Sequence, residues 1–137
     1  MCDTMDSSKG RAPTPSRRWW LAPILWALLL FVASSIPGTS YPEVGFQYAD
    51  KIVHLGIYGM LGALLALAAR LTKPWSAGRV WLFAVGLATV YGATDELHQL
   101  LVPNRSADLR DLLADAVGAA LGAAFTLTVV KRSARRV

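Results

Sequence analysis

Residues 49–70, ADKIVHLGIYGMLGALLALAAR, decide the fold of this chain. An aspartate, a lysine and a histidine lie at the start of an apolar run that extends from about Ile52 to Ala69, and Arg70 follows it. As an α-helix rising about 1.5 Å per residue, such a run is close to the roughly 30 Å thickness of a hydrocarbon core. The segment therefore predicts a transmembrane helix with ionisable side chains gathered at one end.

Three further apolar blocks have a similar length. They run from Trp19 to Ile36, from about Val80 to Leu101 and from about Leu112 to Val130. With 54% hydrophobic residues among 137, the chain is too apolar for an ordinary soluble domain. Short connections favour antiparallel packing of successive helices. We therefore predict an all-α fold, a compact four-transmembrane-helix bundle over residues 19–130, with a disordered tail at 1–18 and a basic tail at 131–137.

The basic residues lie mainly on one side of these blocks. Eleven of the 14 Lys and Arg fall in the two tails or between the second and third blocks: Lys9, Arg11, Arg17, Arg18, Arg70, Lys73, Arg79, Lys131, Arg132, Arg135 and Arg136. Because basic segments resist translocation, this predicts a multi-pass protein of the cell membrane with both termini cytoplasmic and the loops at 37–51 and 102–111 outside. The net charge of +5 then reflects topology, and we expect no nucleic-acid partner.

Polar side chains collect beside the two loops predicted to lie outside. Ionisable groups are costly within a membrane, so those at the edge of a span are candidates for function. Ten residues form the predicted binding site: Asp50, Lys51, His54, Tyr58, Asp95, Glu96, Gln99, Arg105, Asp111 and Asp115. Residues four apart share a helix face, which aligns Asp50 with His54 and Asp111 with Asp115. Three helices thus bring His54, Glu96 and Asp115 to a matched depth, roughly 6–8 Å below the outer helix ends.

Several polar residues in this region also have structural explanations. Asp108 and Asp111 lie near a helix start, where carboxylates satisfy free backbone N–H groups. Lys51 suits an interfacial anchor. His98 suits the membrane interface better than the site. These explanations are weakest for His54, Glu96, Gln99, Arg105 and Asp115.

Glycines recur at positions that allow close helix packing. Gly56, Gly59 and Gly62 punctuate the second block, and Gly118 and Gly122 form a GxxxG pattern in the fourth. Small residues at this spacing let two backbones approach closely in lipid. We predict that they pack helices within one chain, in preference to a dimer.

Charge restricts what the predicted site can bind. Six carboxylates gather there, on Asp50, Asp95, Glu96, Asp108, Asp111 and Asp115, against the cations Lys51, Arg105 and Arg110. Crowded like charges do not all ionise at low dielectric, so protons, a cationic His54, a metal or a cationic ligand must supply the balance. No HExxH or EF-hand spacing is present. We therefore expect no cofactor and keep a divalent metal as the alternative.

The order and spacing of these motifs resemble the VanZ-like family of small membrane proteins, named for a protein linked to teicoplanin resistance. The resemblance is carried by Asp50-Lys51-Ile52-Val53-His54 with Tyr58, by Asp95-Glu96-Leu97-His98-Gln99, and by Pro103, Arg105, Asp111, Asp115, Gly118 and Gly122. The chain differs from the family at Asp115, a position where the family often carries asparagine. The resemblance implies a multi-spanning envelope protein with an influence on glycopeptide susceptibility. It implies no settled reaction, substrate or cofactor.

Three functions remain open at this level. We favour binding or handling of an envelope molecule from the outer leaflet, either a lipid-linked cell-wall precursor or a phospholipid headgroup, with Arg105 and Lys51 meeting a phosphate or carboxylate. The second is an intramembrane hydrolase or transferase that uses His54 or Glu96 as the general base. The third is a structural envelope scaffold whose polar residues only join helix ends.

Overall fold

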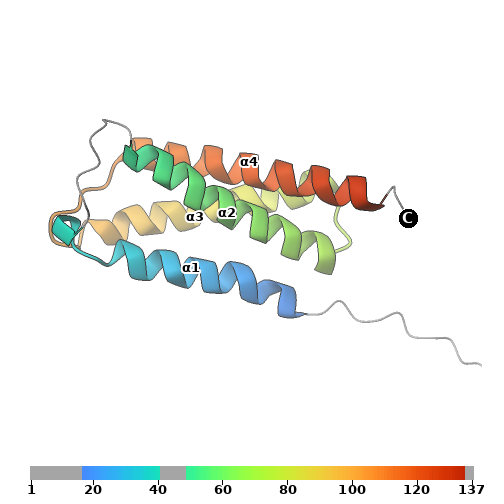
Figure 1. The fold of residues 1–137 in the computed structure, drawn as a ribbon, viewed down its shortest axis with the longest axis horizontal. Coiled ribbons are helices and arrows are strands. Elements are labelled where there is room, and N and C mark those ends of the chain that lie inside the picture. Colours follow the sequence, from blue (N-terminus) through green and yellow to red (C-terminus); the bar gives the residue numbers. More distant parts are fainter. Residues whose placement is uncertain (1–16, 41–48, 135–137) are drawn as a thin grey trace, which may run out of the picture.

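The computed structural model describes residues 17–40 and 49–134. The elements in chain order are η1 (Arg17–Trp20), α1 (Leu21–Ser34), η2 (Gly38–Ser40), α2 (Ala49–Thr72), α3 (Ala77–Gln99) and α4 (Leu109–Ala134). This confirms the predicted all-α fold with four long helices (Figure 1). The tail predicted at 1–18 lies outside the described residues, apart from the first two residues of η1. Of the basic tail, residues up to Ala134 continue α4.

Three helical segments are long and apolar enough to cross a membrane: Arg17–Ser34, Ala49–Thr72 and Leu109–Lys131. The chain is therefore a membrane protein. The predicted third span, now α3, is similar in length to α2 and α4, but Arg79, Asp95 and Glu96 lie within it and lower its apolar character. The four-span count and the orientation stay predictions.

Large apolar side chains cover the outside of the bundle, and small side chains fill much of its inside. Leu25, Leu82, Leu121 and Phe125 are among the exposed ones, whereas the core includes Ala66, Ala69, Ala84, Ala88, Ala119 and Ala123. A soluble bundle buries its large apolar side chains, because their exposure to water is unfavourable. This reversed distribution is consistent with contact between the helices and lipid.

The closest helix pair is α2 with α4, and glycines make it possible. A Cβ atom added to Gly122 would collide with the carbonyl oxygen of Gly59, and one added to Gly118 would collide with that of Leu55. This confirms the prediction that the GxxxG pattern packs helices within the chain. The prediction that Gly56 also allows close helix packing is wrong, because a Cβ atom there meets nothing within 4 Å.

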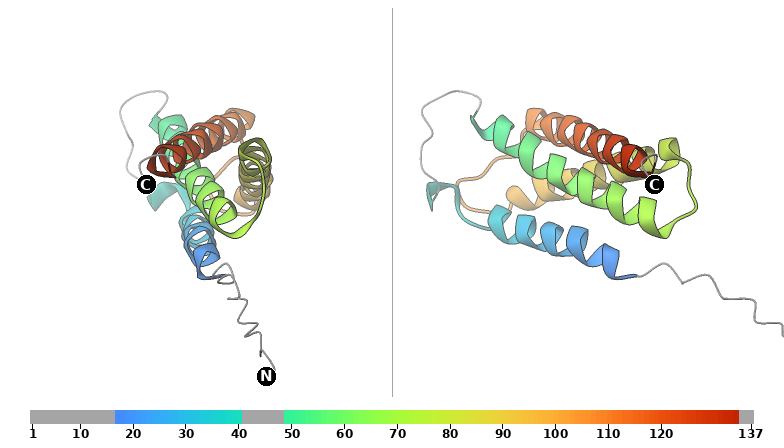
Figure 2. Two further views of the ribbon diagram at one scale, coloured as in Figure 1. Left: turned by 90° about the vertical axis from the view of Figure 1, so that its right-hand side faces the viewer. Right: turned by 45° about the vertical axis from the view of Figure 1, so that its right-hand side comes forward.

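Helix α1 packs along the side of the group formed by α2, α3 and α4, as the end-on view in Figure 2 shows. Hydrogen bonds from aromatic side chains join α1 and the preceding η1 to the neighbouring helices. Trp26 Nε1 donates to the Ile57 carbonyl at 2.9 Å, and the Tyr91 hydroxyl donates to the Ala27 carbonyl at 2.6 Å. At the start of α1, Trp20 Nε1 donates to Thr72 Oγ1 at 3.1 Å. These hydrogen bonds fix a helix that has few close backbone contacts.

The connections place polar residues at one end of the bundle. Helix α3 ends at Gln99, and the following loop turns through Asn104, whose φ of 57° is left-handed. The amide of Gly38 donates to the Pro103 carbonyl at 3.1 Å, so the loop after α3 lies against η2. The starts of α2 and α4 and the end of α3 meet here, whereas α1 begins and α4 ends at the other end (Figure 1).

Candidate functional site

Lys51 lies at the centre of an ionic cluster that joins α2 to the start of α4. Its Nζ is 2.8 Å from Asp50 Oδ2, 2.9 Å from Asp108 Oδ2 and 2.6 Å from Asp111 Oδ1. The side chain is only 19% exposed, whereas that of Asp50 is 57% exposed. The buried Asp111 therefore holds the lysine on the inner side, and the more exposed Asp108 and Asp50 complete the group.

Asp108 caps α4. Its Oδ1 accepts a hydrogen bond from the Arg110 amide at 2.8 Å, at the second position of the helix, which confirms the structural explanation for this residue. The hydrogen bond from Lys51 lowers the pKa of Asp108, and the Arg110 amide adds to the effect. The Asp108 amide donates in turn to Glu96 Oε2 at 2.8 Å, so the same residue links α4 to α3.

The deeper part of the cluster is a pair formed by His54 of α2 and Asp115 of α4. His54 Nδ1 lies 2.9 Å from Asp115 Oδ1, and the Asp115 side chain is fully buried. Tyr58 lies one turn below His54 and is also fully buried, with the two rings parallel and their centroids 6.2 Å apart. Among the described residues, neither the Tyr58 hydroxyl nor Asp115 Oδ2 has a hydrogen-bond partner.

Helix α3 contributes three buried polar side chains from its last two turns. Gln99 Nε2 donates to Asp95 Oδ2 at 3.2 Å, one turn away on the same helix. Within the described part of the chain, Asp95 Oδ1 and Glu96 Oε1 are buried without a hydrogen-bond partner. Buried polar atoms are nearly always paired, so unpaired oxygens on adjacent helices require an explanation.

The ten predicted residues do not all converge. Lys51, His54, Glu96, Asp111 and Asp115 come together, and Tyr58, Asp95 and Gln99 lie buried near them. Arg105 turns toward the α1–η2 connection, where its Nε donates to the Ile36 carbonyl at 3.4 Å. His98 packs on α1, with its ring 4.8 Å from that of Phe31 and its Nε2 3.0 Å from Ser35 Oγ.

Sequence reasoning missed Gly92. A Cβ atom at this position would lie 2.7 Å from Asp115 Oδ2 and 3.3 Å from Tyr58 Cε1, so glycine provides the room for the buried carboxylate. Its spacing was a signal in the sequence. Gly92 lies three residues before Asp95 and four before Glu96, and residues at these spacings share a helix face.

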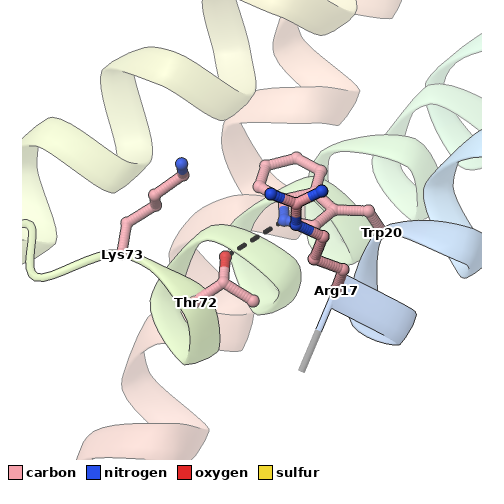
Figure 3. Close-up of a pocket in the computed structure, with 4 residues that line it drawn as sticks. All are labelled: Arg17, Trp20, Thr72 and Lys73. Atoms are coloured by element: carbon pink, nitrogen blue, oxygen red, sulfur yellow. Dashed lines mark hydrogen bonds between the residues drawn. The ribbon is translucent and has the colours of Figure 1, made fainter. Parts of the chain in front are cut away.

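Two cavities lie away from this cluster. One of about 540 Å³ is lined by Arg17, Trp20, Thr72 and Lys73 at the opposite end of the bundle, where α1 begins (Figure 3). The other, of about 200 Å³, is an apolar groove between α1 and the neighbouring helices, and Trp20 borders both. Neither is lined by a carboxylate or a histidine. The ionisable groups that can do acid–base or ligand chemistry therefore lie elsewhere, at the Lys51–Asp115 end.

A helical bundle with an apolar exterior and a buried cluster of carboxylates, lysine and histidine defines a class of protein, a helical membrane protein with ionisable groups buried between its helices. The VanZ/LLP1 family matches residues 17–130, and the chain belongs to that family. No curated protein and no solved structure matches the chain.

Proposed function

We propose that this protein binds the polar part of a cell-envelope molecule at the end of the bundle where α2 and α4 begin. The observation that carries this proposal is a set of buried polar oxygens without a partner in the described residues, on Tyr58, Asp95, Glu96 and Asp115. They come from three helices and border the His54–Asp115 pair. A ligand that supplies donors would satisfy them at once.

The chemistry of these atoms narrows the ligand. Lys51 is already opposed by three carboxylates, and Arg105 reaches a backbone carbonyl, so the cationic groups expected to meet a phosphate are engaged with the protein. The unpaired atoms are mainly carboxylate oxygens, which complement hydroxyl, amide N–H and ammonium groups. Sugar hydroxyls or the amine of a phospholipid headgroup fit this pattern. A lipid-linked cell-wall precursor or a phospholipid presents such groups.

The orientation predicted from the basic residues places this end of the bundle in the outer leaflet. Envelope precursors and lipid headgroups are present at that level. A protein that binds an envelope molecule at this site would change which envelope molecules are accessible to a glycopeptide outside the membrane. This is our proposed link between the site and teicoplanin susceptibility.

The test is native mass spectrometry of protein released from a mild detergent, comparing wild type with Glu96→Gln. Loss of a co-purifying lipid or precursor in this near-isosteric variant is the expected result. His98→Gln is the control, because His98 contacts Phe31 and Ser35 outside the cluster, and this variant is expected to retain the ligand. An empty wild type, or equal loss in both variants, would contradict the proposal.

The His54–Asp115 pair supports a second function, an intramembrane hydrolase or transferase. A carboxylate that binds Nδ1 orients the imidazole and leaves Nε2 to act as a general base. Glu96, whose carboxylate lies close to the ring, would act as the acid. Headgroup turnover that is abolished by both His54→Gln and Glu96→Gln, and retained by His98→Gln, is the result expected from this function.

A further inference from the structure

Three side chains from three helices place metal-binding atoms close together. A ring nitrogen of His54, a carboxylate oxygen of Glu96 and one of Asp111 all lie within 4.8 Å of one another. Glu96 and Asp111 are buried, and the His54 side chain is only 12% exposed. Because α2, α3 and α4 each supply one group, no short sequence motif marks the arrangement.

Asp115 contacts one ring nitrogen of His54, as a carboxylate commonly does for a metal-binding histidine. Its Oδ1 binds Nδ1 at 2.9 Å, which leaves Nε2 as the nitrogen able to bind a metal. Most metal-binding histidines use their second nitrogen to contact a carboxylate or carbonyl, and this contact fixes both the tautomer and the direction of the ring. The pair is therefore an observation separate from the spacing of the three donors.

The Glu96 side chain gives an independent indication that a cation binds at this cluster. Its side chain is 6% exposed, and the Asp108 amide holds Oε2 at 2.8 Å, so the carboxylate cannot rotate freely toward water. Its other oxygen, Oε1, is buried and has no hydrogen-bond partner in the described ranges. A buried carboxylate oxygen without a donor is unfavourable, and a bound cation would satisfy it.

Charge favours a divalent ion. Lys51 takes one oxygen of Asp111, at 2.6 Å from Oδ1, and leaves Oδ2 of the same carboxylate able to bind a metal. Lys51 also contacts Asp50 and Asp108, but its contacts do not include Glu96 or Asp115. One lysine thus offsets only part of the negative charge of this cluster. A divalent ion between His54, Glu96 and Asp111 would offset much of the rest.

We infer that His54, Glu96 and Asp111 form a binding site for one divalent transition-metal ion of the zinc class. An imidazole with two carboxylates suits such an ion better than Mg²⁺ or Ca²⁺, which prefer oxygen alone. Bonds of about 2.0–2.2 Å place tetrahedral ligand atoms roughly 3.3 Å apart, so small side-chain rotations bring the trio from its present spacing to that geometry. Three protein ligands leave a fourth position open.

This inference rests on the proposed function, because it deepens the same site. The open position would bind an oxygen of the envelope molecule, a hydroxyl or a phosphate, and so would supply the anion-binding charge that Lys51 and Arg105 do not. The ion would also polarise that oxygen as a Lewis acid if the site is catalytic.

The experiment measures Zn²⁺ binding to the full chain in detergent. Protein purified without chelator is dialysed against Zn²⁺, and bound metal is counted by inductively coupled plasma mass spectrometry and titrated by calorimetry. About one Zn²⁺ per chain is expected for wild type, with affinity at least tenfold lower in His54→Ala, Glu96→Gln and Asp111→Asn. Asp115→Asn should weaken binding by about 10- to 100-fold through the histidine. His98→Gln, which changes a histidine that contacts Phe31 and Ser35 outside the cluster, should bind as wild type does.

Co²⁺ added to wild type gives a measurement that requires no variant to fold. Intense visible absorption from tetrahedral Co²⁺, displaced by Zn²⁺, is the expected result. Absence of stoichiometric Zn²⁺ and of this absorption in wild type would overturn the inference, as would equal binding by His98→Gln and the three ligand variants when all are folded.

The two proposals fail in different ways. If metal-free protein treated with chelator still co-purifies with an envelope molecule and does not bind Zn²⁺, the metal site is wrong and the proposed function stands. If Zn²⁺ binds at one per chain and wild type carries no envelope molecule with or without the metal, the metal site stands and the proposed function fails.

Discussion

His54 Nδ1 on α2 and Asp115 Oδ1 on α4 are 2.9 Å apart, in a part of the bundle where the Asp115 side chain has no exposed area. The contact lies on the same helix pair that the glycines bring together. Close backbones therefore allow two short polar side chains to meet directly. This pair both fixes the register of α2 against α4 and orients the imidazole of the site.

We expect the His54–Asp115 pair to be energetically coupled. Removing one partner of a buried ion pair costs about 3–5 kcal/mol, because the other is left uncompensated. Asp115→Ala and His54→Ala should each lower the free energy of unfolding by about that amount, and the double variant should lose clearly less than their sum. Reversible denaturation in mixed micelles measures all three.

His98→Ala supplies the control for this cycle. His98 contacts Phe31 of α1 and Ser35 just after it, and forms no hydrogen bond or ion pair with Asp115 in the part of the chain that the structure describes. Its effect should therefore add to that of Asp115→Ala within about 0.5 kcal/mol. Additive effects of His54→Ala and Asp115→Ala would show that the pair is not formed in the membrane protein.

We expect Gly122→Ala to destabilise the bundle and Gly56→Ala not to. A methyl group at Gly122 would collide with the backbone carbonyl of Gly59, and backbone cannot rotate away as a side chain can. Overpacking of this kind typically costs about 1–3 kcal/mol. At Gly56 a Cβ meets nothing within 4 Å, so alanine should leave stability unchanged or raise it slightly. Thermal unfolding in detergent compares the two, and equal effects would contradict the α2–α4 packing.

Helix positions and the end at which polar groups gather were predictable from local pattern. The apolar block from Ile52 to Ala69 corresponds to α2, and the matched depth expected for His54, Glu96 and Asp115 followed from helix geometry alone. Such features depend on the rise per residue and the periodicity of a single helix, and both can be applied directly to the sequence. The small residues of these blocks predicted close packing within one chain, but not that α2 and α4 would be the pair.

The directions of long side chains were not predictable. Lys51 has four rotatable side-chain bonds, and three acids, on α2, on α4 and just before α4, decide where its ammonium lies. Arg105 was expected in the site, yet its Nε reaches Ile36 because η2 and the loop after α3 lie together. Both outcomes depend on contacts between segments far apart in the chain. No periodic pattern in the sequence indicates these contacts.

We expect Lys51→Met to destabilise the site end of the bundle more than Lys51→Arg does. Methionine keeps the apolar length of the side chain but leaves Asp50, Asp108 and Asp111 without their shared cation. Hydrogen bonds to charged groups are worth about 1.5–3 kcal/mol, so a loss in that range is expected. The exposed Lys73, which lies 5.9 Å from the Trp75 ring at the other end, gives the control Lys73→Met. Denaturation in micelles at low and high salt measures the effect, and equal losses for the two methionine variants would refute the assignment.

The orientation of the bundle can be tested with the single native cysteine. Cys2 precedes α1, and the basic residues predict that it lies in the cytoplasm, so a membrane-impermeant thiol reagent should label it only after cells are permeabilised. In a Cys2→Ser background, Ser106→Cys in the exposed loop after α3 should be labelled in intact cells. Ser76→Cys, at the exposed N-cap of α3, should behave as Cys2 does. Because Ser76 and Ser106 flank α3, opposite accessibility would establish that this helix spans the membrane despite Asp95 and Glu96. Labelling of both from the same side would instead place α3 on one face of the membrane and reduce the number of spans.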